Sequence, residues 1–146
     1  MLRGNYPTRV DSKGRIKMPA DFRRYIEEKY GRDFYVTSLT GEQVRIYPLP
    51  EWIAIEDKLA QVPDMDPAKQ KFLDRVNYFG KLTSMDGQGR VLIHPLLRTH
   101  AELDGEVSVV GHLLYVEVWN ASKFAHRVRS EVYTTEDAAA ISKFGI

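Results

Sequence analysis

The sequence contains no cysteine, and this absence excludes disulfide frameworks, zinc sites built on thiolates and cysteine nucleophiles together. It also lacks any run close to the roughly 20 apolar residues that span a bilayer. The opening segment, Met1 to Tyr6, has no apolar stretch of the kind found in signal peptides or membrane anchors. We therefore expect a soluble protein of the reducing cytoplasm, without a membrane partner.

The sequence also lacks a large net charge, which is only +1 at pH 7. Its charged residues are nevertheless unevenly distributed along the chain. Residues 1–30 hold eight basic and four acidic side chains, whereas the rest of the chain holds 13 basic and 16 acidic ones. The cationic segment is either an ordinary solvated surface or an electrostatic footprint for phosphate. With 43% hydrophobic and 11% aromatic residues, the chain can bury a core without disulfides or metal.

The sequence contains an internal repeat. Residues 11–19 (DSKGRIKMP) return as residues 86–95 (DGQGRVLIHP), with the aspartates (86 − 11) and the arginines (90 − 15) each 75 positions apart. Each copy continues with patterns that indicate strand, turn, strand, helix, hairpin and helix. We therefore predict a mainly β protein with short helices (α+β), built from two copies of one unit.

The repeat sets the expected organisation of the chain. We place the first repeat at residues 1–63, a connecting helix at 64–80, the second repeat at 81–130 and a tail at 131–146. The two repeats are expected to form one folded unit. Asp66 is suited to cap the connecting helix, which would begin at Pro67 and end at Gly80. The predicted hairpins are 34–47 and 107–119, and the helices predicted after them are 51–60 and 121–128.

The repeated Asp-x-x-Gly-Arg segment is typical of a tight turn that leads into a strand, because the aspartate can bond nearby amides and the glycine can supply a positive φ. The predicted turn-forming residues are Asp11, Gly14, Asp86 and Gly89. The arginine then begins the strand, where it can bond a phosphate or a guanine edge through two hydrogen bonds. The alternative interpretation is that each aspartate pairs with its own arginine and only pins the turn.

Together with residues 3–6 (RGNY), the two Asp-x-x-Gly-Arg segments resemble the MraZ family of bacterial regulators, over residue 1 to about residue 128. These regulators have a tandem form of the AbrB-type swapped-hairpin fold. The resemblance implies a small swapped-hairpin β-barrel built from the two repeats of one chain. It also implies ring-shaped homo-oligomers, of about eight subunits, on the nucleoid. Such rings bind double-stranded DNA at short direct repeats upstream of cell-division and cell-wall genes.

Carried onto this chain, the resemblance implies that Arg15 and Arg90 face DNA, with Lys13 beside the first of them. The full set of predicted DNA contacts is Arg3, Lys13, Arg15, Gln88 and Arg90. The chain departs from the family pattern at His94, which stands where the second copy usually has a proline. Gln88 replaces the basic residue of the first copy, so we expect the second turn to bind phosphate more weakly.

No residue pattern predicts an enzyme, a cofactor or a small-molecule substrate. The Gly-x-Gly at residues 87–89 lacks the third glycine and the helix of a dinucleotide site, and the four histidines lack metal-site spacing. No Gly-x-Ser-x-Gly turn presents a nucleophile. We favour a DNA-binding transcription regulator. The alternative is a ring-forming scaffold that binds a protein and touches DNA incidentally, and such a scaffold would not require cations at an exposed turn.

Overall fold

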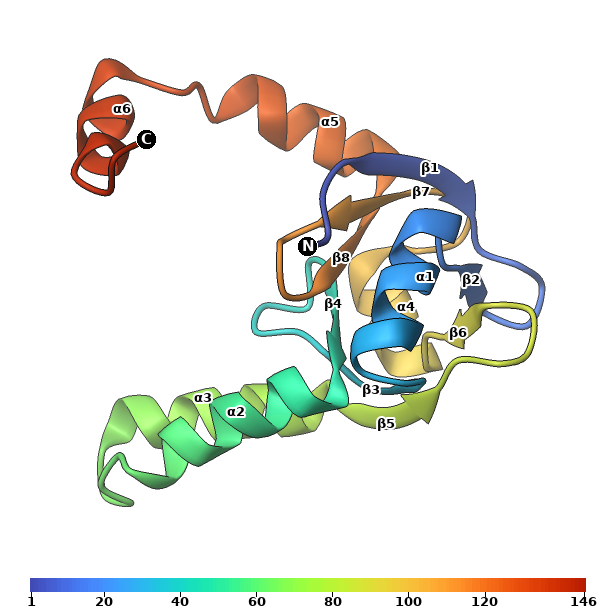
Figure 1. Ribbon diagram of the computed structural model, residues 1–146, viewed down its shortest axis with the longest axis horizontal. Helices are drawn as coiled ribbons and strands as arrows, with labels where there is room; N and C mark the ends of the chain where they lie inside the picture. Colours follow the sequence, from blue (N-terminus) through green and yellow to red (C-terminus); the bar gives the residue numbers. More distant parts are fainter.

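A computed structural model describes residues 1–146 and contains eight strands and six helices (Figure 1). The first half comprises β1 (Asn5–Arg9), β2 (Arg15–Lys17), α1 (Ala20–Lys29), β3 (Asp33–Thr37), β4 (Val44–Pro48) and α2 (Leu49–Ala60). After α3 (Pro67–Tyr78) come β5 (Lys81–Ser84), β6 (Arg90–Leu92), α4 (Pro95–Ala101), β7 (Glu106–Gly111), β8 (Val116–Asn120), α5 (Ala121–Ser130) and α6 (Thr135–Ser142). The predicted α+β class is confirmed. None of the helices has the length and apolar character of a membrane span.

The main sheet exchanges strands between the two halves of the chain. Its order is β1-β7-β8-β4-β3-β5, with all neighbours antiparallel. Because β5 corresponds to β1 and β7 to β3, the order reads the same from either end when the repeats are interchanged. The first strand of each repeat therefore pairs with the hairpin of the other repeat, as a swapped-hairpin fold requires.

The two edges of the main sheet, β1 and β5, do not pair with each other, so the hydrogen-bonded ladder stays open. β2 and β6 form a separate two-stranded sheet with antiparallel register. Ile16 of β2 and Val91 of β6 are fully buried in the same cluster of 20 core residues as the inner side chains of the main sheet. The barrel implied by the family resemblance thus consists of two sheets around one core.

Alternation along the central strands separates an inner face from an outer face. In β4, Val44 and Ile46 point into the main core, whereas Tyr47 belongs to a smaller cluster with Trp52 of α2 and Val76 of α3. Helices α2 and α3 lie side by side and extend away from the sheet (Figure 1). α3 begins after Asp66, whose carboxylate accepts the amide of Ala68 at 2.8 Å, as the sequence predicts.

An ion pair between a buried carboxylate and a half-buried arginine lies at the centre of the outer face. Arg45 of β4 stands directly opposite Glu117 of β8, and Arg45 Nε lies 3.3 Å from Glu117 Oε2. The same carboxylate accepts a hydrogen bond from Trp119 Nε1 at 2.9 Å, and Arg45 Nη1 donates to the hydroxyl of Tyr47 at 3.2 Å. Because only 7% of the Glu117 side chain is exposed, these partners take the place of water around the carboxylate.

Candidate nucleic-acid interface

Loop 1 (residues 11–14) joins β1 to β2 and is closed by its own aspartate. Asp11 Oδ1 accepts the backbone amides of Lys13 and Arg15, each at 2.9 Å, and Oδ2 accepts Arg15 Nε at 2.8 Å. The amide of Gly14 donates to the carbonyl of Asp11 at 3.0 Å. Gly14 has a φ of +82°, a region that favours glycine. The hydrogen bonds that close this turn thus lie within five consecutive residues.

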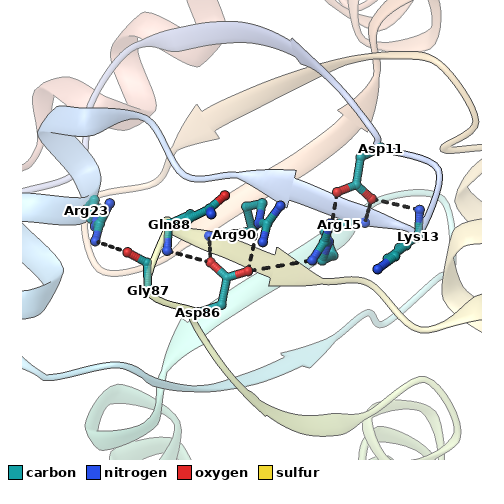
Figure 2. Close-up of polar contacts among 8 residues, drawn as sticks. All are labelled: Asp11, Lys13, Arg15, Arg23, Asp86, Gly87, Gln88 and Arg90. Carbon is teal, nitrogen blue, oxygen red and sulfur yellow. Dashed lines mark hydrogen bonds and ion pairs between the residues drawn. The ribbon is translucent and has the colours of Figure 1, made fainter.

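Loop 2 (residues 86–89) repeats this geometry between β5 and β6 (Figure 2). Asp86 Oδ1 accepts the amides of Gln88 and Arg90, each at 2.9 Å, and Oδ2 accepts Arg90 Nε at 2.8 Å. Gly89 has a φ of +78° and donates its amide to the carbonyl of Asp86 at 3.0 Å. Repetition of the motif in the sequence therefore corresponds to repetition of the turn in space.

The strands β2 and β6, which we call the basic ribbon, place the two loops at opposite ends of one surface (Figure 2). Ile16 and Val91 point into the core, so Arg15, Lys17 and Arg90 lie on the other, outer face. Lys17 is directly opposite Arg90. Met18 donates its amide to the Gly89 carbonyl, so the four residue steps from Gly14 to Met18 separate the loops along β2, or about 13 Å at the rise of a strand. The ribbon therefore joins both loops into a single cationic surface.

The two arginines use only part of their hydrogen-bonding capacity within the protein. Arg15 and Arg90 each donate through Nε to their own aspartate, and their terminal nitrogens take part in no intramolecular hydrogen bond. Arg15 Nη1 comes within 3.8 Å of Asp86 Oδ2, which links it to the opposite loop. The side chains are 24% and 30% exposed. The ion pair that pins each turn is thus present, and it fixes a guanidinium whose remaining donors can still meet an anion.

Both aspartates keep their charge well into acid solution. The backbone amide of Arg90 is the main cause that lowers the pKa of Asp86 to about 2, and the amide of Arg15 likewise lowers the pKa of Asp11. Each carboxylate therefore offsets one cation at neutral pH. Residues 11–17 retain three basic groups against one acidic group, whereas residues 86–92 have one of each. The surplus of positive charge lies at the first loop and along β2.

Three cationic residues that the sequence analysis did not assign to the site belong to its surroundings. Lys17 is exposed on the basic ribbon, two residues from Arg15, and strand alternation would have placed it there. Arg98 of α4 covers the α-carbon of Gly14, and Arg23 of α1 covers that of Gly89. The pairs Phe22-Arg23 and Leu97-Arg98 occupy the same position in both repeats. That repetition was the available signal, but sequence alone does not show which loop each arginine meets.

The remaining predicted contacts occupy different places. Gln88 is exposed in loop 2. Its backbone amide donates to the carboxylate of Asp86, and its side chain forms no hydrogen bond. Lys13 is exposed in loop 1. Arg3 is exposed before β1, whereas loop 1 follows the other end of that strand, so about 26 Å of extended chain separates Arg3 from Asp11. The structure gathers Lys13, Arg15, Gln88 and Arg90 around one ribbon and leaves Arg3 apart.

The histidines do not form a common site, and no three His, Asp or Glu side chains are arranged to hold a metal ion. His94 precedes α4, and both of its ring nitrogens are buried without a hydrogen-bond partner. This burial lowers the pKa of His94 and favours the neutral ring. His112 instead places Nε2 3.2 Å from Glu117 Oε1 on the outer face of the main sheet.

The chain matches the family model described as "MraZ protein, putative antitoxin-like" over residues 1–75 and 81–142. A protein of Acidobacterium capsulatum named transcriptional regulator MraZ is 52% identical over 146 residues, and the match covers all of both chains. A protein of the same name from Koribacter versatilis is 50% identical over 147 residues, again with complete coverage. One from Salmonella newport is 33% identical over 139 residues, which are 94% of this chain and 91% of the relative. The family match includes loop 1, loop 2 and the basic ribbon.

Proposed function

The chain belongs to the MraZ family of transcriptional regulators, and we propose that it regulates transcription by binding double-stranded DNA through loop 1, loop 2 and the basic ribbon. The names of the relatives denote regulators and not enzymes, in agreement with the expectation of a non-enzyme. The proposed targets are short direct repeats upstream of cell-division and cell-wall genes, contacted in the cytoplasm on the nucleoid. The proposed active form is a ring of about eight copies.

One observation carries the proposal: a two-stranded ribbon with an outward row of cations ends in two rigid turns. The major groove of B-DNA, about 12 Å wide, admits such a ribbon. Arg15 and Arg90 are already fixed by their aspartates, so little side-chain entropy is lost when their terminal nitrogens bond a phosphate or a guanine. Lys13 and Lys17 add mobile charges that suit phosphate oxygens.

A single chain offers too few contacts for tight binding. Three cations on loop 1 and β2, namely Lys13, Arg15 and Lys17, give a salt slope of at most about 3 on a log–log plot. Several copies joined in a ring and facing successive repeats raise the overall affinity by roughly 10²–10⁴ through effective concentration. A protein with a net charge of +1 can then bind strongly, and chiefly where the spacing of DNA repeats matches the ring.

The surface supports self-association. Five large apolar side chains near the C-terminus are at least 61% exposed, and they are Val128, Val132, Tyr133, Phe144 and Ile146. Apolar side chains gathered in one exposed segment mark an interaction surface. Light scattering on the full chain should give a mass several times 16.8 kDa, and a monomer at micromolar concentration would reject the ring.

The decisive experiment is DNA binding at two or more salt concentrations, with a duplex that carries the direct repeats upstream of the protein's own gene. We expect R15A and K13A each to weaken binding about tenfold and to reduce the salt slope by about one phosphate contact. The variant K71A is the matched control, because Lys71 is an exposed cation of α3 and lies outside both the ribbon and the C-terminal apolar segment. It should behave as the unaltered protein does.

The scaffold hypothesis predicts a different result. If R15A and K13A form the same oligomer as the unaltered protein and bind the duplex with the same affinity and salt slope, the ribbon does not contact DNA. DNA association would then be incidental. The exposed apolar segment near the C-terminus would become the principal interaction surface.

A further inference from the structure

Strand exchange brings each loop against a helix of the opposite repeat. Met18 donates its amide to the carbonyl of Gly89 at 2.8 Å, and Ile93 donates to that of Gly14 at 3.0 Å. The chain then continues from Met18 into α1 and from Ile93 into α4. As a consequence, Arg23 of the first repeat packs on loop 2, and Arg98 of the second repeat packs on loop 1.

These two equivalent arginines differ in their partners. Arg23 Nε donates to Glu27 Oε1 at 2.6 Å, and Arg23 Nη2 donates to the carbonyl of Gly87 at 3.1 Å (Figure 2). The side chain of Arg98 forms no hydrogen bond and no ion pair, and its Nε is buried without a partner. A buried donor without a partner is costly, and an incoming acceptor removes that cost. Arg98 is therefore a cation that lacks a counter-ion in the isolated chain.

The difference between the two arginines arises from the length of their helices. In α1, Glu27 lies four residues after Arg23 on the same helical face, so the two side chains meet. α4 is shorter and ends at Ala101, and the next residue, Glu102, has a left-handed φ of +56°. Its carboxylate consequently turns to Lys123 at 3.1 Å and does not reach Arg98. The groove beside Arg98, about 430 Å³ in volume, also contains Asp104, which forms no ion pair with it.

We propose that Arg98 of the second repeat completes the phosphate-binding site of loop 1, so that loop 1 is the stronger of the two DNA-contacting ends. A backbone phosphate of DNA would bond the guanidinium of Arg98 together with Lys13 and the free nitrogens of Arg15. Arg23 covers loop 2 but is not a DNA contact, because its charge is offset by Glu27. This inference rests on the proposed DNA-binding function and adds a difference between the two loops. Each chain would bind DNA mainly through the loop 1 end of its ribbon.

The test compares R98M with R23M, since methionine keeps much of the apolar stem and removes the charge. Binding to the direct-repeat duplex is measured by fluorescence anisotropy over a range of salt concentrations. We expect R98M to lose about tenfold in affinity and about one contact in the salt slope. R23M should keep the slope of the unaltered protein. If R15A weakens binding while R98M does not, Arg98 is no contact and the proposed function stands; if R15A, K13A and R98M all bind normally, the proposed function itself fails.

A second comparison does not depend on the folding of R98M. Replacing Glu27 by glutamine releases Arg23, so E27Q should gain about one contact in the salt slope. Glu27 also pairs with Arg32 at 3.6 Å, and the double variant E27Q/R23M releases that residue equally. The gain should therefore be present in E27Q and absent from E27Q/R23M. Equal slopes in these two variants would overturn the view that the carboxylate of Glu27 is what weakens loop 2.

Discussion

Replacement of Gly14 by alanine should destabilise the protein through two separable effects. The first is backbone strain, because an alanine at a φ of +82° costs about 1–2 kcal/mol. The second is steric, because the added Cβ would overlap the guanidinium of Arg98 and force it away from loop 1. Because these atoms are the far end of a flexible side chain, a change of rotamer relieves the overlap at a cost of about 0.5–1.5 kcal/mol. We therefore expect G14A to lose about 1.5–3.5 kcal/mol in the free energy of unfolding.

Gly31 provides the matched control for the strain alone. Its φ is +94°, and an added Cβ would meet no atom within 4 Å. G31A should therefore lose about 1–2 kcal/mol, and urea unfolding of both variants gives the difference directly. G89A is the intermediate case, since its Cβ would lie 3.0 Å from the flexible side chain of Arg23. If G14A proves no less stable than G31A, Arg98 does not constrain loop 1 and the description of that contact is wrong.

Three further predictions concern other parts of the fold. E117A should lose about 3 kcal/mol of stability in urea unfolding, because it leaves Arg45 and Trp119 without their buried acceptor, whereas E131A, at an exposed pair, should lose under about 1 kcal/mol. Burial lowers the pKa of His94, so the stability that its neutral ring contributes is complete above the unfolded pKa of about 6.5 and declines as the pH falls below that value. The melting temperature should therefore fall between pH 7 and pH 5. The variant H94P, which suits the φ of −65°, should show a smaller fall over the same range. D66A should cost about 1 kcal/mol through loss of the α3 cap, and an unchanged melting temperature would contradict it.

The turn and the helix cap could be predicted from the sequence because the residues that bond to one another in them are close along the chain. The turn at Asp11 involves five consecutive residues, and Asp, Gly and Arg each have a defined task within it. The cap at Asp66 is equally local. Repetition after 75 residues then assigns the same turn to residues 86–90 without a separate argument.

The exchange of strands could not be derived from periodicity. The alternation of β1 is equally compatible with pairing to β3 of its own repeat or to β7 of the other, and only the family resemblance favoured the second. The same limit applies to Arg23 and Arg98, since the loop that each one covers depends on this exchange. The pairing choice is decided by how both halves share one core, which is a property of the whole chain.

The sequence also did not show which of the two arginines that cover the loops is neutralised by a carboxylate. The sequence shows Glu27 and Glu102 at equivalent distances after Arg23 and Arg98, which suggests two equal ion pairs. The structure forms only the first, because α4 ends one residue before Glu102. A difference in helix length of a few residues thus decides whether an arginine is neutralised, and such boundaries are poorly determined by local sequence.

Interleaving of the two halves has a consequence during biosynthesis. Arg9 at the end of β1 pairs with Glu106 in β7, 97 residues later. At elongation rates of about 5–20 residues per second, a ribosome needs roughly 5–20 s to make that stretch. Until then the nascent amino-terminal half has unsatisfied strand edges and an incomplete apolar interior, a state open to chaperones or to premature association with a neighbouring nascent chain.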